Sequence, residues 1–510
     1  MFPIDFLRYA ARATPEAVAV IDSNKICTFG TLVERSDALG SALQAAGGKL
    51  RPVVGILGPN DIEMLGAVMA IHACGGIVVP LNARNARAEL DSQIAFARPD
   101  VLVVHSAYLD RISPGGPPVM IACGEQGDPR SIAEHERAHV GRCPEWTARP
   151  EDINGLKFTG GSSGKPKGVQ QSFRSINTLI ASVVIAFELR ADDRFLCAAP
   201  MTHGAGAFLL PILSQGGSVV LSADASPSHL LDLIERQRIT AIWLPPTLLY
   251  KLIDEQVVNP RDVSSLRHLI WGGAAASVAR LREARAVFGP IVEVVYGQTE
   301  APLILTYGRA ADMHGERLAS VGQVGPLIDV AVLGPDGNRL PPGEIGEICC
   351  RGDLVMKGYL AMPEETAATI REGWLHTGDL GMFDENGFLF VKDRIRDVVI
   401  TGGFNVYPSD VEAALSLHPA VSEAVVFGLP DDHWGERLEA AIEIREGHAV
   451  THQDILDHCK ALLGSVKTPK RVYIVASLPR SPVGKVLRRE ARAQALAGQL
   501  ADAEKPEALA

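Results

Sequence analysis

Lys157-Phe-Thr-Gly-Gly-Ser-Ser-Gly-Lys-Pro-Lys-Gly-Val169 is the segment of the chain with the clearest chemical signature. Three glycines and three hydroxyl residues fill positions 159–164, and Lys165 and Lys167 follow. Glycines let backbone N–H groups approach an anion closely, and hydroxyl groups add further donors. Lysines add mobile positive charge. The segment therefore predicts a loop that holds a polyphosphate, although on its own it also fits a flexible surface loop.

Two other motifs compete for this segment. A Walker A loop requires Gly-Lys followed by Ser or Thr, but Pro166 follows Lys165 here, and Thr159 stands where the first glycine should be. The Gly-x-Ser-x-Gly pattern of a hydrolase elbow does occur at residues 160–164. An elbow serine must lead directly into a helix, and Pro166 disfavours helix at the residue before it. A serine hydrolase is therefore the weaker interpretation.

Size and composition restrict the class of protein. With 510 residues and 47% hydrophobic content, the chain is long enough for roughly two to four domains. A net charge of −11 argues against nonspecific binding to nucleic acid. The eight cysteines lack Cys-x-x-Cys spacing, which favours free thiols in a reducing cytoplasm. We see no signal peptide and no apolar run near the ~20 residues of an integral membrane segment.

The pattern of apolar residues predicts an α/β protein with layered subdomains. Short apolar strands alternate with helical segments up to about residue 300, which indicates parallel sheets covered by helices. From about residue 317, Gly and Pro interrupt short apolar runs, and Asn386-Gly387 marks a hairpin, so we expect a β-rich subdomain. We predict a large N-terminal domain at 1–393, a hinge at 394–397 and a small mobile α+β domain at 398–510.

Further motifs follow the loop in a fixed order along the chain: Pro200-Met-Thr-His-Gly-Ala-Gly-Ala-Phe208, Trp271-Gly-Gly-Ala-Ala-Ala276, Tyr296-Gly-Gln-Thr-Glu300, Thr377-Gly-Asp379, Asp393-Arg-Ile-Arg-Asp397, Thr401-Gly-Gly-Phe-Asn-Val-Tyr-Pro408 and Pro479-Arg-Ser-Pro-Val-Gly-Lys-Val-Leu-Arg488. The ordered set resembles the adenylate-forming superfamily, which includes acyl-CoA synthetases, luciferases and peptide-synthetase adenylation domains. One departure is Gly160, where the family usually has Ser or Thr.

The resemblance implies a binding site for ATP and Mg²⁺. Tyr296 would stack on adenine, Thr299 would bind the α-phosphate, Glu300 would bind Mg²⁺, and Asp379 would accept from the ribose hydroxyls. Arg394 would also contact the nucleotide. The complete set that the resemblance assigns to the nucleotide is Thr159, Gly160, Gly161, Ser162, Ser163, Gly164, Lys167, Gly273, Ala274, Ala275, Tyr296, Gly297, Gln298, Thr299, Asp379 and Arg394.

The resemblance also implies a two-step cycle. Lys485 would bridge the substrate carboxylate and the α-phosphate while acyl-AMP forms. The small domain would then rotate about Arg396, and the segment of Gly402, Gly403 and Phe404 would line the tunnel for coenzyme A. The family often has Lys or Asp at the hinge position, so arginine is a small departure.

The segment at 200–208 bears on the acid substrate. In the peptide-synthetase domains that the chain resembles, an aspartate in this segment holds the amino group of the substrate. The segment here has no acidic residue, so the resemblance disfavours an α-amino acid. It also has no arginine to pair with a second carboxylate. His203 would stand at the mouth of the acid pocket as a catalytic or binding residue. The small residues there leave room for a medium-chain, aromatic or alicyclic acid. The full set assigned to the acid is His203, Gly204, Ala205, Gly206, Trp271, Gly272 and Leu303.

The leading prediction is an ATP-dependent acid–CoA ligase. One alternative is an acyl-AMP synthetase that loads a carrier protein, and a second is a non-catalytic nucleotide-binding module. Retention of Glu300, Asp379, Arg394 and Lys485 together argues against the second alternative. Family members are often dimers, so a homodimer remains open.

Overall fold

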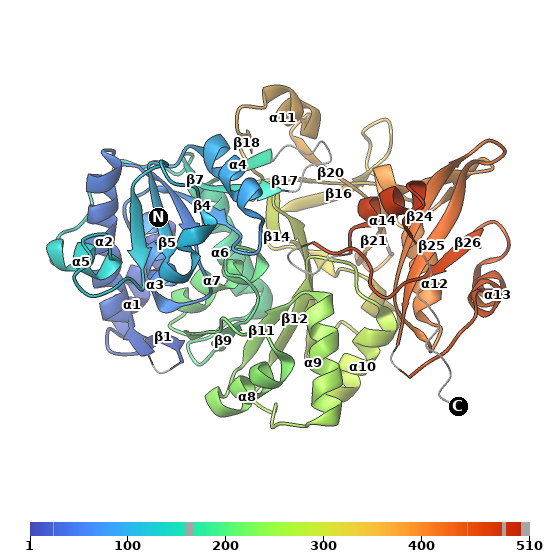
Figure 1. Cartoon of the computed structure of the whole chain (residues 1–510), viewed down its shortest axis with the longest axis horizontal. Helices are drawn as coiled ribbons and strands as arrows, with labels where there is room; N and C mark the ends of the chain where they lie inside the picture. Colours follow the sequence, from blue (N-terminus) through green and yellow to red (C-terminus); the bar gives the residue numbers. More distant parts are fainter. Residues whose placement is uncertain (24, 160–166, 446, 482–485, 501–510) are drawn as a thin grey trace.

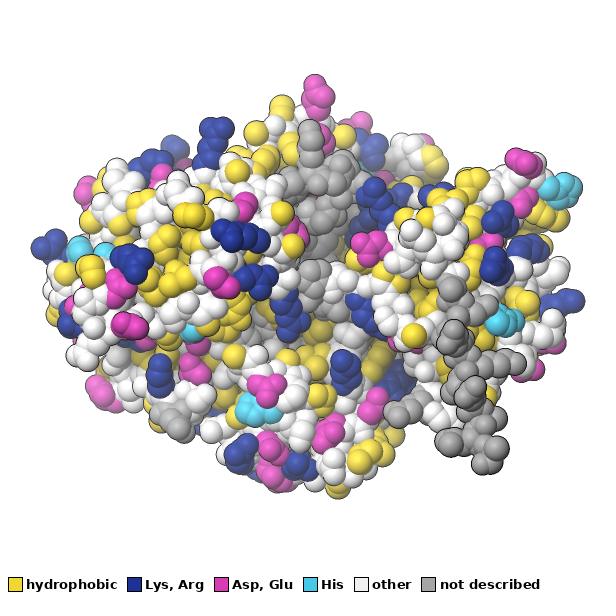
Figure 2. All heavy atoms as spheres, in the orientation of Figure 1, with side chains coloured by type: hydrophobic (Ala, Val, Ile, Leu, Met, Phe, Trp, Pro, Cys, Tyr) yellow, Lys and Arg dark blue, Asp and Glu magenta, His cyan; other side chains and the backbone are white. Residues whose placement is uncertain are grey.

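The computed structural model describes residues 1–23, 25–159, 167–445, 447–481 and 486–500. Figure 1 shows a large body that contains the N-terminus and a smaller C-terminal domain beside it. Positive and negative side chains are mixed over the visible face, without a large area of one sign (Figure 2). No helix in the described ranges is long and apolar enough to cross a membrane.

A nine-stranded sheet forms the centre of the large body, and the pairing of its inner strands is parallel. In sheet order its strands are β15 (Gln323–Val324), β14 (Ala301–Gly308), β13 (Val292–Gln298), β12 (His268–Gly272), β11 (Ala241–Leu244), β9 (Arg194–Cys197), β10 (Ser218–Leu221), β1 (Val18–Asp22) and β2 (Lys25–Thr28). One face packs against α8 (Pro227–Gln237), α9 (Pro246–Val258) and α10 (Val278–Phe288). The other face packs against α1 (Pro3–Ala13), α6 (Phe173–Phe187) and α7 (Leu209–Ser214).

A seven-stranded sheet forms the second layered unit of this body. In sheet order its strands are β18 (Gly358–Tyr359), β8 (Lys167–Ser172), β7 (Ile153–Thr159), β4 (Ile77–Leu81), β3 (Val53–Leu57), β5 (Val101–His105) and β6 (Val119–Ala122). The helices beside it are α2 (Phe29–Gly47), α3 (Ile62–Ala73), α4 (Arg87–Ala97) and α5 (Ile132–Ala138). Helix α3 lies between the two sheets, because its apolar residues join the cores on both of its sides. The predicted α/β layers are confirmed.

The β-rich subdomain and the C-terminal domain follow. The first contains β16 (Asp329–Leu333), β17 (Gly346–Arg351), β19 (Ile370–Arg371), β20 (Trp374–Phe383) and β21 (Leu389–Arg394), all antiparallel, with α11 (Pro363–Thr369) beside them. The second contains β22 (Val399–Thr401), β23 (Phe404–Val406), β24 (Val421–Asp431), β25 (Gly435–Ile444), β26 (Arg471–Ile474), α12 (Pro408–Ser416), α13 (His452–Leu463) and α14 (Arg488–Leu496). Short 3₁₀ segments are η1 (Ser106–Arg111), η2 (Gly204–Phe208), η3 (Gly315–Ala319) and η4 (Ile395–Asp397).

The cysteines are all free thiols. Six are buried, and only Cys123 and Cys143 are exposed. Burial raises the pKa of the Cys74 and Cys197 thiols to about 12, so these two groups remain protonated near neutral pH.

Candidate active site

A buried carboxylate links the central sheet to the β-rich subdomain. Asp379 is 7% exposed, and its Oδ2 accepts a hydrogen bond of 2.7 Å from the Tyr296 hydroxyl. Arg394 Nε lies 3.2 Å from Asp379 Oδ1. Burial, followed by the charge of Asp379, raises the pKa of Tyr296 well above its usual value, so the hydroxyl stays a donor. Three residues that the sequence assigned to the nucleotide are therefore in direct contact.

The local fold explains why Asp379 and Arg394 meet. They are cross-strand partners in the β20–β21 hairpin, which turns at Asp384–Gly387. Thr377 Oγ1 accepts from the backbone N–H of Asp379 at 3.1 Å and donates to the Ile348 carbonyl at 2.6 Å. The aspartate is thus held on a rigid element, as recognition of a ligand requires.

A second group of residues surrounds Glu300. Strand β13 continues through Gln298, and the chain then reverses at Thr299 and Glu300 into the antiparallel strand β14, so the motif spans the strand end and the turn. The Tyr359 hydroxyl donates to Glu300 Oε1 at 2.9 Å. Lys167 Nζ lies 5.1 Å from the centre of the Tyr359 ring. The phosphate-loop lysine and the carboxylate assigned to Mg²⁺ therefore contact the same tyrosine.

The ends of the phosphate loop are fixed by β pairing. Thr159 and Lys167 are cross-strand partners of β7 and β8, which brings the two flanks of the loop together. The Gln171 side chain donates to the Thr299 carbonyl at 2.8 Å and ties β8 to the Glu300 turn. The loop residues assigned to the nucleotide lie outside the described residues, and so does Lys485; the loop set is Gly160, Gly161, Ser162, Ser163 and Gly164.

Glu300 suits a Mg²⁺ ion in chemistry and position. Its Oε1 accepts from the Tyr359 hydroxyl, and the ring of Tyr359 lies 5.1 Å from Lys167 Nζ, at the described end of the phosphate loop. Mg²⁺ commonly takes one or two protein carboxylates and completes its shell with phosphate oxygens and water. The single carboxylate at this turn therefore fits the ion.

His203 and Trp243 define the side of the sheet where the acid would bind. His203 directly precedes η2, and Thr202 Oγ1 lies 2.9 Å from its Nδ1. The His203 side chain is exposed, yet the protein atoms around it displace enough water to lower its pKa to about 4, helped by the charges of Lys157 and Arg84. The imidazole is therefore neutral at pH 7.

Trp243 is a residue that the sequence did not single out. A Cβ at Gly204 would lie 2.6 Å from its ring, and one at Gly273 would lie 3.6 Å away. A Cβ at Gly272 would lie 3.3 Å from its indole Nε1, which is buried and has no hydrogen-bond partner among the described residues. The glycines of two separate motifs thus converge on one indole. Its only signal in the sequence was its place in the apolar run Ala241–Leu244, which predicted a strand.

Three residues assigned to the acid have packing roles in the fold. Trp271 pairs with Leu244, and its side chain packs with α8–α10 on the sheet face opposite Trp243. Its place in the acid pocket stays a prediction. Ala205 is fully buried in the core. A Cβ at Gly206 would come within 1.8 Å of the Met201 carbonyl oxygen. The small size of Ala205 and Gly206 is therefore required by internal packing, whatever binds nearby.

The remaining assigned residues lie near the strand ends. Gly273, Ala274 and Ala275 follow β12 directly. Gly297 lies against Leu303, because a Cβ there would come 2.7 Å from the Leu303 backbone, and Leu303 itself has φ 64. Gln298 pairs with Ala301 at the turn.

Gly402 and Gly403 form the two-residue turn of the β22–β23 hairpin, with φ 56 and 81. Positive φ at both positions favours glycine for this turn, whatever passes nearby. Phe404, next to the turn, is 60% exposed. The resemblance attributes these glycines to a tunnel for coenzyme A. The positive φ angles of the turn are an independent reason for glycine at both positions.

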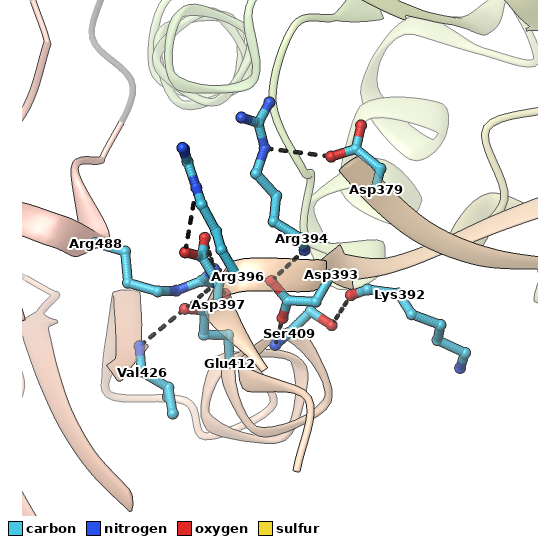
Figure 3. Close-up of polar contacts among 10 residues, drawn as sticks. All are labelled: Asp379, Lys392, Asp393, Arg394, Arg396, Asp397, Ser409, Glu412, Val426 and Arg488. Atoms are coloured by element: carbon cyan, nitrogen blue, oxygen red, sulfur yellow. Dashed lines mark hydrogen bonds and ion pairs between the residues drawn. The ribbon is translucent and has the colours of Figure 1, made fainter. Parts of the chain in front are cut away.

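Arg488 joins the C-terminal motif to the segment between the domains (Figure 3). Its Nη1 lies 2.9 Å from Asp393 Oδ1 and 3.0 Å from Asp397 Oδ2, and its Nη2 lies 2.9 Å from Glu412 Oε1. Arg396, the proposed hinge residue, lies between the two aspartates and is exposed. In the sequence, Arg488 is recognisable only as the last residue of a motif. Its ion-pair partners lie about 75–95 residues away, so no local pattern predicts them.

Comparison with known proteins gives a consistent result. Residues 7–360 match the sequence profile of the AMP-binding enzyme family, and residues 410–485 match the AMP-binding enzyme C-terminal domain. A feruloyl-CoA synthase of Amycolatopsis is 34% identical over 488 residues, which cover 94% of this chain and 96% of that protein. The medium/long-chain-fatty-acid–CoA ligase FadD8 of Mycobacterium tuberculosis is 41% identical over 352 residues, 68% of this chain and 62% of that protein. The solved amide bond synthetase McbA of Marinactinospora thermotolerans has a TM-score of 0.87 at 31% identity, and the match covers 96% of this chain and 99% of McbA.

Proposed function

Because this chain belongs to the AMP-binding enzymes, in the adenylate-forming acyl-CoA synthetase branch, we propose that it activates a carboxylic acid with ATP and transfers the acyl group to coenzyme A. In the first step a carboxylate oxygen attacks the α-phosphorus of ATP, which forms acyl-AMP and releases pyrophosphate. In the second step the thiol of coenzyme A, losing its proton, attacks the acyl carbon, and AMP leaves.

The Tyr296–Asp379–Arg394 contact is the observation that supports this proposal most directly. A buried carboxylate normally requires partners, and Asp379 has a hydroxyl and a guanidinium on its two oxygens. Its position on a rigid hairpin beside the Tyr296 ring suits the ribose and the base of one nucleotide. Tyr296 and Asp379 would orient the nucleotide, and Arg394 would fix the aspartate.

Charge near the transferred group would come from Lys167, Glu300 and Lys485. Lys167 would bind phosphate oxygens, and Lys485 would stabilise the charge that develops between the carboxylate and the α-phosphorus. Glu300 would hold Mg²⁺, which when bound supplies positive charge to the phosphates. The neutral His203 would accept or donate a hydrogen bond at the mouth of the acid pocket without adding charge there.

A hydrophobic medium-chain, aromatic or alicyclic acid is the substrate class of this proposal. FadD8 and the feruloyl-CoA synthase are named for acids of two of these kinds. The name of McbA, by contrast, specifies an amide bond as the product, so the acceptor in the second step is part of the test. A carrier protein is the second acceptor considered. Free thiols at all eight cysteines favour a cytoplasmic location.

Pyrophosphate release with ATP and Mg²⁺ across straight-chain, aromatic and alicyclic acids tests this function. Release that requires an acid and accelerates with coenzyme A supports the ligase. Acid-dependent release that is not accelerated by coenzyme A but is accelerated by an amine or a carrier protein would identify that molecule as the acyl acceptor. No release with any acid, combined with nucleotide binding in calorimetry, would indicate a non-catalytic binding module.

A further inference from the structure

Lys157, on the strand that leads into the phosphate loop, is a cation with no counter-ion among the described residues. It lies on β7, two residues before Thr159, and its side chain is half-buried. It forms no hydrogen bond or ion pair with any residue in the described ranges. Burial lowers the pKa of Lys157 to about 8, so the ammonium is still mostly charged at pH 7. An unpaired, partly desolvated charge is costly, and proteins usually retain one only where it has a function.

Strand geometry places Lys157 on the side of the acid pocket. Leu156 and Phe158, its neighbours on β7, pack in the cluster with β3, β4 and α4. Lys157 alternates with them, and its cross-strand partner Val169 is fully buried in the core that also contains Ala205 and Trp243. Because successive residues of a strand face opposite sides, Lys157 faces the region between the two sheets.

The groups that face Lys157 come from three other elements. Its charge lowers the pKa values of His203, before η2, and of His72, on α3, to about 4 in each case, after the larger effect of burial. The charge of Arg84 also lowers the pKa of His203, so a second positive charge lies near this histidine. Neither histidine carries charge at pH 7, and no carboxylate contributes to the pKa shifts of Lys157, His203 or His72.

An unpaired acceptor on the same face supports a polar ligand here. Gln171 is fully buried, and its Oε1 has no hydrogen-bond partner among the described residues. A Cβ at Gly155 would lie 3.4 Å from this atom, which places it on the Gly155 and Lys157 face of β7. Buried acceptors rarely lack partners, so Gln171 Oε1 fits a hydrogen-bond donor of the ligand, such as a hydroxyl or N–H group, and the Lys157 ammonium is the only one of the two that fits an anionic oxygen.

We propose that Lys157 is the specificity residue for the acid substrate, and that the acid carries a second anionic oxygen group, such as a second carboxylate, which pairs with the Lys157 ammonium. This inference rests on the proposed function and narrows its substrate class. It also revises the argument from residues 200–208, where the absence of arginine disfavoured diacids, because the cation comes from β7. Lys167 lies over the Tyr359 ring, whose hydroxyl donates to Glu300, and is a separate cation from Lys157.

The test compares pairs of acids with the same skeleton, one with a methyl or hydrogen end and one with a carboxylate end, in straight-chain and ring-bearing series. Acid-dependent pyrophosphate release gives kcat/KM for each acid and KM for ATP. The variants are Lys157→Met, which keeps the aliphatic stem, and Lys251→Met, which removes an exposed lysine of α9 as the matched control.

We expect the wild type to prefer the doubly anionic acid by at least ~10-fold, the scale of a hydrogen bond to a charged group. Lys157→Met should lose that preference while KM for ATP changes less than ~3-fold, and Lys251→Met should keep it. The preference should also decline as the pH rises from 7 through 8 to 9.5, because Lys157 loses its proton.

Three results would overturn the inference. If the wild type does not prefer acids with a second anionic group, Lys157 does not select the acid. The same conclusion follows if the Lys157→Met variant keeps the preference. A rise in KM for ATP that is equal for all acids would assign the lysine to a phosphate oxygen. A wild type that releases pyrophosphate with no acid would instead remove the proposed function itself.

Discussion

Arg488 Nη1 lies 2.9 Å from Asp393 Oδ1, although 95 residues separate them in the chain. Asp393 is in the last strand of the β-rich subdomain, and Arg488 begins the last helix of the C-terminal domain. The same guanidinium reaches Asp397, on the other side of Arg396, at 3.0 Å. One side chain therefore spans the proposed hinge, and rotation about Arg396 would separate Arg488 from Asp393 but not from Asp397.

Asp393→Ala should change the ratio of the two half-reaction rates by roughly 5-fold, the scale of one partly buried ion pair. The half-reaction that uses the described domain orientation should slow, and the other should not. Asp397→Ala is the matched control, because its contact with Arg488 would survive the rotation. The measurement is acyl-AMP formation and thioester formation from supplied acyl-AMP. An equal ratio in wild type and Asp393→Ala contradicts a role for this contact in the domain motion.

Asp379→Asn should raise KM for ATP by ~10- to 100-fold, because it removes the negative charge that pairs with Arg394 and weakens acceptance from the ribose. Tyr296→Phe keeps the ring and loses only the hydroxyl that donates to Asp379, so its effect should stay below ~10-fold. Initial rates at saturating acid measure both. A larger effect for Tyr296→Phe than for Asp379→Asn would mean that the hydroxyl itself contacts the nucleotide.

Glu300→Gln should raise the Mg²⁺ concentration for half-maximal activity by at least ~10-fold, since an amide is a much weaker ligand for a hard cation. Tyr359→Phe removes the donor to Glu300 Oε1 without removing the carboxylate, and its shift should remain below ~3-fold. Titration of activity with Mg²⁺ at fixed ATP checks both variants. An unchanged Mg²⁺ requirement in Glu300→Gln would show that another group holds the ion.

Lys485→Ala should lower the rate of acyl-AMP formation by at least ~100-fold, the scale for one preorganised charge donor in a transition state. Thioester formation from supplied acyl-AMP should be nearly unchanged. Isotope exchange between pyrophosphate and ATP measures the first step alone. Intact exchange in the variant would remove the proposed role of this lysine.

The stability of the protein should fall as the pH drops from about 6.5 to 4. Burial lowers the pKa of His72 to about 4, so the unfolded chain binds a proton in this range that the folded protein does not. His72 alone should contribute about 3 kcal/mol of lost stability at pH 4. His72→Gln should flatten the pH dependence of the denaturation midpoint. A slope equal to that of the wild type would show that His72 is not buried neutral.

Local patterns were sufficient to predict much of the fold. Apolar runs such as Val53–Leu57 and Val101–His105 became buried parallel strands, because a continuous apolar run is typical of a strand covered on both faces. The Asn386-Gly387 signal became the hairpin that pairs Asp379 with Arg394. These features depend on residues close together in the chain, where turn chemistry and periodicity act.

The contacts that complete the site depend on residues far apart. Tyr359 meets Glu300 because the two-residue strand β18 pairs with β8, and no periodicity marks so short an element. Two tryptophans, Trp243 and Trp271, lie near the ends of neighbouring strands. Because the strands pair with a one-residue offset between the two tryptophans, their side chains lie on opposite faces of the sheet. Sequence patterns identify such residue types but not their partners.

The distribution of thiols also makes the protein convenient to label. Cys123 and Cys143 are the exposed cysteines, and both belong to the large body. A chain with both changed to serine would leave only shielded thiols, and a cysteine placed on each side of residues 394–397 could then take a fluorophore pair. The distance between the two bodies could be followed through a catalytic cycle without disturbing the interior.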